Sequence, residues 1–348
     1  MKPDLNHKIR RLTLLWILLP IFSAWFFFES TKPHTCSIFT AVQSENVLFG
    51  DNFDYHQGDL VIGFYPASSE GYGSIHFGFK TGNGSNSGQS YSRAVNDQGL
   101  AWAVNSIPRG KLNPQPEKIY SHAEDNYFST IIKQAATVEE AISLAKVFDF
   151  GDSLGVQIHV ADASGDAVVI GPGRDGEITF TRKSIYDGYL LSTNFNLAIP
   201  EKGPVDFRYD TATTMLDELT DLQALTPEYA GEILNALHLR TLTTHTLFSN
   251  VIDLKNGEIY VYYISQYNEV VRLNIADELV KGYRVVDARD MFSASTAKAG
   301  DASYHSFEVR FTLVKIVVIL AGLALILTGV VIVVKKFKRH QQAKTIQG

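Results

Sequence analysis

Cys36 is the one cysteine of this 348-residue chain, and its surroundings in the sequence predict a nucleophile. A lone cysteine forms no internal disulfide, so its thiol has little structural use. The preceding residues, ESTKPHT, are polar and end in a small side chain, which predicts an accessible peptide bond between Thr35 and Cys36. Cleavage there would place the α-amine of Cys36 beside its own thiol, and an α-amine with a pKa of about 8 can take the thiol proton at neutral pH. We therefore expect a thiolate nucleophile that needs no separate histidine, the alternative being a buried and inert free thiol.

Apolar segments near both ends of the chain predict attachment to a membrane. Residues 12–28 follow the basic sequence MKPDLNHKIRR and are mostly apolar, as in a signal peptide or signal anchor. Residues 316–334 contain no charged side chain and, at about 1.5 Å per residue, come close to the roughly 30 Å thickness of the hydrocarbon core. Basic residues precede the first segment and follow the second, so both ends are expected in the cytoplasm and the middle outside it.

The distribution of charge and hydropathy divides the chain into successive parts. We expect a cytoplasmic basic end, signal or anchor helix and propeptide over 1–35, an extracytoplasmic domain over 36–292, a polar linker over 293–311, a transmembrane helix over 312–334 and a basic cytoplasmic tail over 335–348. Between the two basic ends there are 22 Lys and Arg residues and 36 Asp and Glu residues. This acidity argues against nucleic acid and against an anionic polymer as a partner. The expected location is a membrane, with the domain at the cell surface, in the periplasm or in a lumen.

The hydrophobic pattern predicts an α+β domain. The segments expected as strands are CSIFTAVQ, NVLFGDN, LVIGFYPA, GLAWAVNSIP (ending at Pro108), VQIHVADA, AVVIGP, EITFTR and GYLLSTNF, followed by the hairpin TLFSNVIDLKNGEIYVYYIS with its turn at residues 255–257. Helices are predicted for TVEEAISLAKVF, with Thr137 as N-cap and Glu140 three residues on, and for FRYDTATTMLDEL and EYAGEILNALH. Strands, then helices, then strands again predict two sheets packed together with helices outside.

Several motifs occur in an order that resembles one group of hydrolases. They are Cys36-Ser37 followed by GDNFD (Gly50–Asp54), then NDQGLAWAVN (Asn96–Asn105), STNF (Ser192–Phe195) and the closing hairpin SNVIDLKNGEIYVYY. Together they resemble the choloylglycine hydrolase, penicillin V acylase and acid-ceramidase-like group of N-terminal-nucleophile (Ntn) hydrolases, which are linear amide C–N hydrolases and peptidase C45-like proteins. The resemblance runs from Cys36 to about residue 265. It implies an αββα four-layer sandwich and hydrolysis of linear N-acyl amide bonds by a cysteine exposed through cleavage before Cys36.

The resemblance also implies a role for each matching residue. Asp54 would orient the α-amine of Cys36 and stabilise it when it is charged. Asn194 would donate its side-chain amide to the oxyanion of the tetrahedral intermediate, and Asn105 would be the second donor. Arg208, in the sequence FRYD, matches the arginine that supports the cysteine site.

Asp51 departs from the pattern of the group. Better-known members have an arginine immediately before the Asn of G-x-N-x-D, whereas this chain has an aspartate. An anion there would raise the pKa of a nearby thiol, and Arg208 or another cation could compensate. Asp51 also places bile salts lowest among the expected substrates. It keeps two alternatives open, which are an inactive binding or sensory ectodomain with this fold and an acyltransferase.

Other kinds of chemistry have weaker signals in the sequence. The ten histidines show no metal-binding spacing such as H-E-x-x-H, so no metal and no other cofactor is expected. The absence of a G-x-S-x-G motif argues against a serine α/β-hydrolase. Asn83-Gly84-Ser85 fits a glycosylation sequon. The expected partners are a small N-acyl amide with a hydrophobic acyl group and the membrane, through the C-terminal span and any retained N-terminal anchor.

Overall fold

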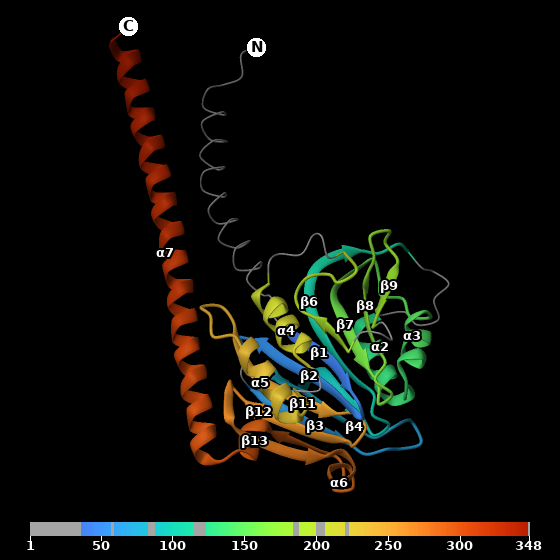
Figure 1. Cartoon of the computed structure of the whole chain (residues 1–348). Helices are drawn as coiled ribbons and strands as arrows, with labels where there is room; N and C mark the ends of the chain where they lie inside the picture. The colour runs from blue at the N-terminus through green and yellow to red at the C-terminus, as the bar shows by residue number, and fades with distance from the viewer. Residues whose placement is uncertain are drawn as a thin grey trace. The chain divides into compact units, whose positions relative to one another are not determined.

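The computed structural model describes residues 36–56, 59–82, 88–114, 123–183, 188–199, 206–219 and 223–346. The expected N-terminal signal or anchor segment, the Thr35–Cys36 bond and the sequon at Asn83 lie outside these residues. Where the chain is described, its strands form two antiparallel sheets (Figure 1).

The two sheets have six and eight strands among the described residues. The six-stranded sheet has the order β10 (Tyr189–Ser192), β1 (Ser37–Gln43), β2 (Asn46–Tyr55), β11 (His245–Asp253), β12 (Glu258–Tyr263) and β13 (Gln266–Asn274). The eight-stranded sheet has the order β14 (Arg284–Asp287), β3 (Leu60–Tyr65), β4 (Ser74–Thr81), β5 (Gly88–Asn96), β6 (Ala101–Lys111), β7 (Ser153–Ala161), β8 (Ala167–Pro172) and β9 (Ile178–Arg182).

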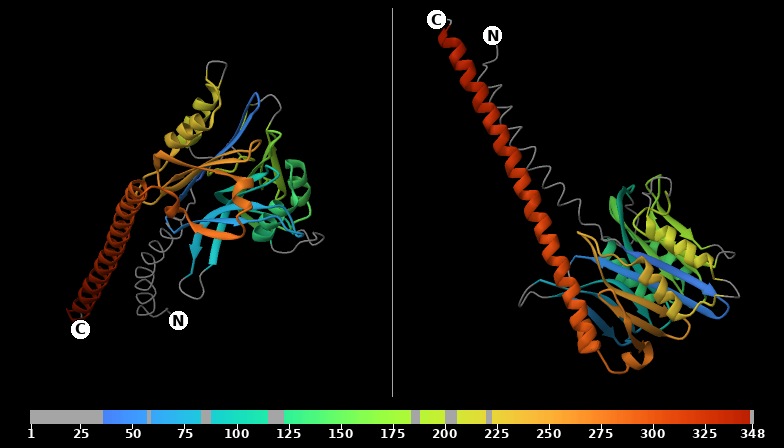
Figure 2. Two further views of the ribbon diagram at one scale, coloured as in Figure 1. Left: turned by 90° about the horizontal axis from the view of Figure 1, so that it is seen from below. Right: turned by 60° about the vertical axis from the view of Figure 1, so that its left-hand side comes forward.

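Hydrophobic side chains fill the space between the sheets and beneath the helices. One cluster, which includes Phe49 and Phe77, draws on both sheets. A second cluster joins the eight-stranded sheet to α2 (Ala123–Gln134) and α3 (Val138–Ala145), and a third joins the six-stranded sheet to α4 (Phe207–Asp217) and α5 (Pro227–Leu237). Figures 1 and 2 show these helix pairs beside their sheets. Alternate residues of a strand therefore face either the other sheet or the helices.

Every strand and helix expected within the domain over 36–292 occurs, in the expected order. The capping box of α3 is confirmed, because the side chains of Thr137 and Glu140 each accept a hydrogen bond from the other's backbone amide. β6 continues past Pro108, where the expected strand ends. Its pairing with β7 is irregular between Ser106 and Gly110, and the proline lies in that gap, where no ladder hydrogen bond is required of it. Seven elements of the described part were not expected: β4, β5, β13, β14, α2, α6 (Ile275–Leu279) and a 3₁₀ helix, η3 (Ala288–Met291).

The C-terminal helix α7 runs from Ala294 to Ile346, so the expected linker over 293–311 is helical instead. Its alanine-rich sequence favours a helix, and the Ser293 hydroxyl accepts a hydrogen bond from the amide of Thr296 at 3.3 Å. Residues 294–336 form the one helix of the described part that is long and apolar enough to cross a membrane. Both sheets belong to a compact unit that ends at His305, and the rest of the helix belongs to a second unit.

β5 contains a β-bulge that decides where one arginine points. Gly78 of β4 pairs with Tyr91 and Phe77 pairs with Arg93, so Ser92 is an additional residue in β5. Phe77 belongs to the cluster between the sheets, and its partner Arg93 faces the same way. In an unbroken strand Tyr91 and Arg93 would share a face, but the extra residue separates them. The bulge therefore directs Arg93 into the space between the sheets.

Gly78 is the position where the bulge tolerates no side chain. A Cβ at Gly78 would lie 1.9 Å from the backbone oxygen of Ser90. We predict that Gly78→Ala lowers the free energy of unfolding by about 1–3 kcal/mol, the usual cost of overpacking. The measurement is urea unfolding of the full-length protein in detergent, followed by near-UV circular dichroism. Gly188→Ala is the matched control, since its Cβ would come no closer than 3.7 Å to Val42, and an equal loss in both variants would contradict the prediction.

Candidate active site

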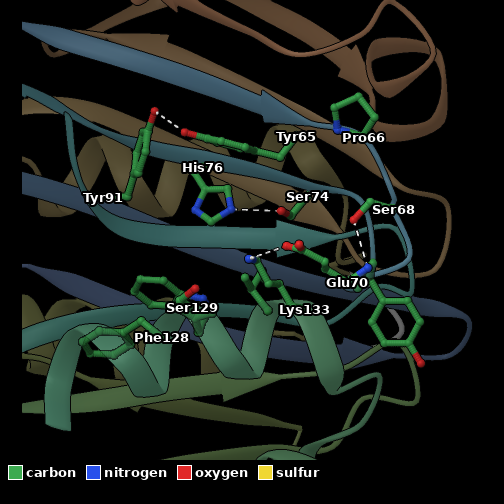
Figure 3. A pocket seen from close by; sticks show the side chains of 14 residues that line it. Tyr65, Pro66, Ser68, Glu70, Ser74, His76, Tyr91, Phe128, Ser129 and Lys133 are labelled. Carbon is green, nitrogen blue, oxygen red and sulfur yellow. Dashed lines mark hydrogen bonds and ion pairs between the residues drawn. The ribbon is translucent and has the colours of Figure 1, made fainter. Parts of the chain in front are cut away.

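A hollow of about 450 Å³ lies between the eight-stranded sheet and α2, on the face of the sheet that α2 covers (Figure 3). Among its lining residues, the Tyr65 hydroxyl donates to the Tyr91 hydroxyl at 3.1 Å, and Ser74 Oγ lies 2.9 Å from His76 Nε2. Burial lowers the pKa of His76 to about 4, so its ring is neutral at pH 7. None of the residues expected to be catalytic lines this hollow, so the candidate active site lies in another part of the domain.

Cys36 directly precedes β1 and is buried between the two sheets, with 1% of its surface exposed. β1 pairs with β2 in a register that places Phe39 opposite Gly50. A Cβ at Gly50 would lie 2.3 Å from the Phe39 ring, so in this chain the close approach of the ring favours glycine at position 50. This close fit places Cys36 beside the end of β2 that carries Asp51 and Asp54.

Asn105 of β6 reaches Cys36 from the other sheet. Its Nδ2 donates to the backbone oxygen of Cys36 at 3.0 Å, and both residues are buried. This contact uses one of the two N–H donors of the carboxamide. The structure therefore places an amide donor directly at the residue expected to be the nucleophile.

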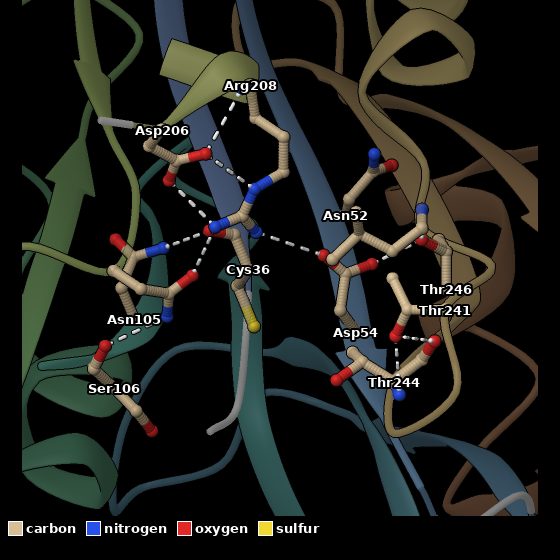
Figure 4. Close-up of polar contacts among 12 residues, drawn as sticks. Cys36, Asn52, Asp54, Asn105, Ser106, Asp206, Arg208, Thr241, Thr244 and Thr246 are labelled. Carbon is tan, nitrogen blue, oxygen red and sulfur yellow. Dashed lines mark hydrogen bonds and ion pairs between the residues drawn. The ribbon is translucent and has the colours of Figure 1, made fainter. Parts of the chain in front are cut away.

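Arg208 of α4 joins the remaining expected residues into one cluster (Figure 4). Its Nη1 donates to Asp54 Oδ2 at 3.4 Å and its Nη2 to Asn194 Oδ1 at 2.9 Å. Asp206, the N-cap of α4, accepts from Nε at 3.0 Å and from Nη2 at 2.7 Å. Asn194 Nδ2 in turn donates to the backbone oxygen of Ser106 at 2.8 Å, next to Asn105 in β6. All the residues expected to be catalytic thus lie in one region around Cys36.

Asp54 is buried and held at both carboxylate oxygens. The Thr246 hydroxyl donates to Oδ1, and Arg208 contacts Oδ2. Burial raises the pKa of Asp54 to about 7, and the charge of Arg208 and the hydrogen bond from Thr246 oppose that rise. The carboxyl group therefore titrates near neutral pH, where an adjacent ammonium group would favour its charged form.

Arg93, which the sequence pattern does not single out, contacts both Cys36 and Asp51. Its Nη2 donates to the sulfur of Cys36 at 3.1 Å, and its Nε donates to Asp51 Oδ2. The same carboxylate oxygen accepts from Asn250 Nδ2 at 3.0 Å. The guanidinium lies over the Phe53 ring, 4.3 Å from its centroid, and the arginine is 2% exposed. The thiol therefore has a cation beside it, although the motif position next to it holds an aspartate.

Opposing influences act on the Cys36 thiol. Burial raises the pKa of the thiol above its ordinary value, and the carboxylates of Asp54 and Asp51 raise it further. The positive charge of Arg93 is the strongest influence that lowers it, and a hydrogen bond from the Asp54 backbone also lowers it. Arg93 is thus the main group of the protein that favours the thiolate.

Sequence reasoning missed Arg93, Thr246, Asp206 and Asn250. Asp51 was a signal for Arg93, because a carboxylate in a buried strand beside a cysteine requires a cation. The sequence offers several arginines, and β5 is not among the expected strands, so the pattern did not identify Arg93. Within the described part of the chain, no group of three or more His, Cys, Asp and Glu residues could hold a metal ion.

Comparison with known proteins identifies the class of fold. No family model matches the chain, and no curated protein matches it in sequence. Among solved structures, however, the chain has the fold of the Ntn choloylglycine hydrolase and penicillin V acylase group, a fold of amide hydrolases. The resemblance found in the sequence is therefore confirmed at the level of the fold.

The particular structures include two forms of conjugated bile acid hydrolase from Clostridium perfringens, a cysteine-to-alanine mutant and an arginine-to-leucine variant. Their TM-scores are 0.55 and 0.57, each at 14% identity over 72% of this chain and 95% of the other. Penicillin V acylase from Agrobacterium tumefaciens has a TM-score of 0.54 at 14% identity, over 72% of this chain and 90% of its own. At this identity the likeness establishes the fold alone.

The raised pKa of Asp54 predicts a specific pH dependence of stability. A carboxyl group whose pKa is about 7 in the folded protein and 3.8 ordinarily binds its proton more tightly when folded. Its contribution to stability is therefore fully present below pH 4 and is lost as the pH rises to about 7. We predict that the urea midpoint of the full-length protein falls over this range and that it falls less in Asp54→Asn. Identical pH profiles for the two proteins would contradict this assignment.

Proposed function

We propose that this protein is a membrane-anchored, extracytoplasmic hydrolase of linear N-acyl amides whose nucleophile is Cys36, exposed as the N-terminus by cleavage after Thr35. The observation that carries the proposal is the convergence of Cys36 with amide donors and with a buried carboxylate–guanidinium pair. Asn105 contacts Cys36 directly, and Arg208 links Asn194 to Asp54. The fold supports the proposal, and we take its arrangement to be the αββα four-layer sandwich.

In the proposed reaction the α-amine of Cys36 takes the proton of the thiol, and the sulfur attacks the carbonyl carbon of the amide. The oxyanion that forms accepts hydrogen bonds from the side-chain amides of Asn105 and Asn194. Asn105 contacts Cys36 directly, and Asn194 is held by Arg208 and by the backbone of Ser106. The ammonium then protonates the leaving nitrogen, and the C–N bond breaks to give a thioester. Water attacks the thioester with the amine as base, releases the acid and restores the thiol.

Asp54 and Arg208 serve the amine side of this reaction. A carboxylate near the ammonium lowers the cost of protonating the amine, and Arg208 lowers the cost of keeping that carboxylate charged in a buried place. Their contact also fixes Asn194, because Arg208 Nη2 donates to the oxygen of its carboxamide and so directs the nitrogen the opposite way.

The proposed substrates are small N-acyl amides with a hydrophobic acyl group, because an anchor would hold the site near lipid. The span within α7 is the proposed anchor, and the basic residues that follow it favour a cytoplasmic tail. Transfer of the acyl group to an amine instead of water is the second candidate, since a thioester accepts either nucleophile. A panel of N-acyl amino acids, N-acylethanolamines, penicillin V and conjugated bile acids, each with and without an added amine, separates these outcomes.

Cleavage before Cys36 is the first test of the proposal. We predict that the purified wild-type protein begins at Cys36 and that Cys36→Ala keeps the preceding residues. Intact mass and N-terminal sequencing measure this directly. A mature wild-type chain that still begins well before Cys36, without amidase activity on the panel, would overturn the mechanism and leave the inactive binding ectodomain.

Loss of an oxyanion donor gives a second, kinetic test. We predict that Asn194→Ala and Asn105→Ala each lower kcat by about 10²–10³, the usual cost of removing one such donor. Asn113→Ala is the matched control, because that asparagine is exposed and contacts Asp175 and Glu177 away from Cys36. Equal kcat values for the two site variants and the control would remove both residues from the proposed oxyanion hole.

A further inference from the structure

The α-amine can take the proton of the Cys36 thiol, but it does not by itself offset the cost of a buried thiolate. The thiol is buried between two sheets, close to two buried carboxylates that disfavour a third negative charge. The motif position where better-known members of the group have arginine carries Asp51, one of those carboxylates. A thiolate at this place requires a cation from another part of the fold.

We propose, given the function proposed above, that Arg93 is the catalytic cation of this site and that Asp51 holds it in place. The charge that the group's motif supplies beside the nucleophile would here come from the opposite sheet. The aspartate at the motif position then serves as the anchor of the arginine.

The hydrogen-bond geometry gives each edge of the guanidinium its own partner. Nε donates to Asp51 Oδ2, and Nη2 donates to the sulfur of Cys36 at 3.1 Å. Because guanidinium is planar and its donors are fixed relative to one another, anchoring Nε on the carboxylate also sets the direction of Nη2. Asn250 holds the same carboxylate oxygen from β11, at 3.0 Å, so the anchor is itself fixed.

The surroundings of Arg93 make its charge effective. Phe53 lies under the guanidinium, at 4.3 Å from the ring centroid, and Phe248 lies at 5.5 Å. These rings exclude water from the cation, and a charge shielded from water acts more strongly on its neighbours. Arg93 and Asp51 are 2% and 0% exposed as side chains, so the pair is not screened as a surface ion pair would be.

Counting Arg93 brings the charges of the site close to balance. A thiolate at Cys36 together with ionised Asp51, Asp54 and Asp206 gives four negative charges, against which Arg93 and Arg208 supply two positive ones. The α-ammonium of a processed Cys36 supplies a third. Without Arg93 the thiolate would form in a buried cluster with excess negative charge, which is strongly unfavourable.

The test is the pH dependence of Cys36 alkylation, which needs no substrate and no turnover. Because the chain has one cysteine, the mass gained from iodoacetamide reports this thiol alone in the full-length protein. We expect Arg93→Met to raise the apparent pKa of alkylation by at least one unit and to slow alkylation at pH 7 at least tenfold. Arg284→Met is the matched control, since Arg284 also lies over a phenylalanine ring, at 3.8 Å from Phe64, and pairs with Glu278. An unchanged apparent pKa in a folded Arg93→Met protein would overturn the proposal.

Two further variants, Asp51→Asn and Arg93→Lys, test the proposal through the apparent pKa of alkylation even if Arg93→Met misfolds. We expect Asp51→Asn to lower the apparent pKa, because it removes a negative charge while keeping an acceptor for Arg93, and Arg93→Lys to raise it less than methionine does. If near-UV circular dichroism shows that Arg93→Met is unfolded, these two variants decide, and unchanged values in both would overturn the proposal. Amidase activity is measured separately, so a protein that shows these shifts but hydrolyses no amide contradicts the proposed function and leaves the assignment of Arg93 intact.

Discussion

The region around Cys36 depends on one buried ion pair, in which Arg93 of the eight-stranded sheet meets Asp51 of the six-stranded sheet. Neither side chain has access to water that could solvate it alone. Removal of one partner from such a pair costs about 3–5 kcal/mol, because the other charge is left buried and uncompensated. The ion pair therefore strongly favours this alignment of the two sheets. The same alignment brings Asn105 of β6 to Cys36. The contact that joins the sheets is also the contact that reaches the sulfur.

A second ion pair, between Asp54 and Arg208, lies on the other side of β2. Asp51 and Asp54 are three positions apart in one strand, so their side chains face opposite ways, one toward the other sheet and one toward α4. Cys36 therefore has polar contacts on two sides, with its sulfur near Arg93 and its backbone near the cluster that Arg208 organises. Among the residues that the structure describes, the Arg93–Asp51 pair and the Arg208–Asp54 pair share no hydrogen bond, so a substitution in one pair removes no contact of the other.

Much of this arrangement could be predicted from the sequence, because it rests on local patterns. The expected strands, the capping box of α3 and the turn before β12 follow from spacing and turn residues that act within a few positions. The motif matches predict that Cys36, Asp54, Asn105, Asn194 and Arg208 belong to one site, and the structure brings these residues together. Arg93 was missed for a physical reason. The alternation that indicates a strand changes phase at Ser92, and the pairing of Arg93 with Asp51 joins residues 42 positions apart in different sheets.

The bulge at Ser92 has a consequence for the evolution of this site. Side-chain direction in a regular strand follows odd and even count, so an extra residue would reverse every side chain beyond it unless a bulge absorbs it. Here the bulge absorbs Ser92, so Tyr91 stays opposite Gly78 and Arg93 stays opposite Phe77. A lineage with this fold could therefore gain or lose the residue at position 92 through a single-codon insertion or deletion and keep its thiol-contacting cation, although a residue-by-residue comparison of motifs would then misalign Arg93.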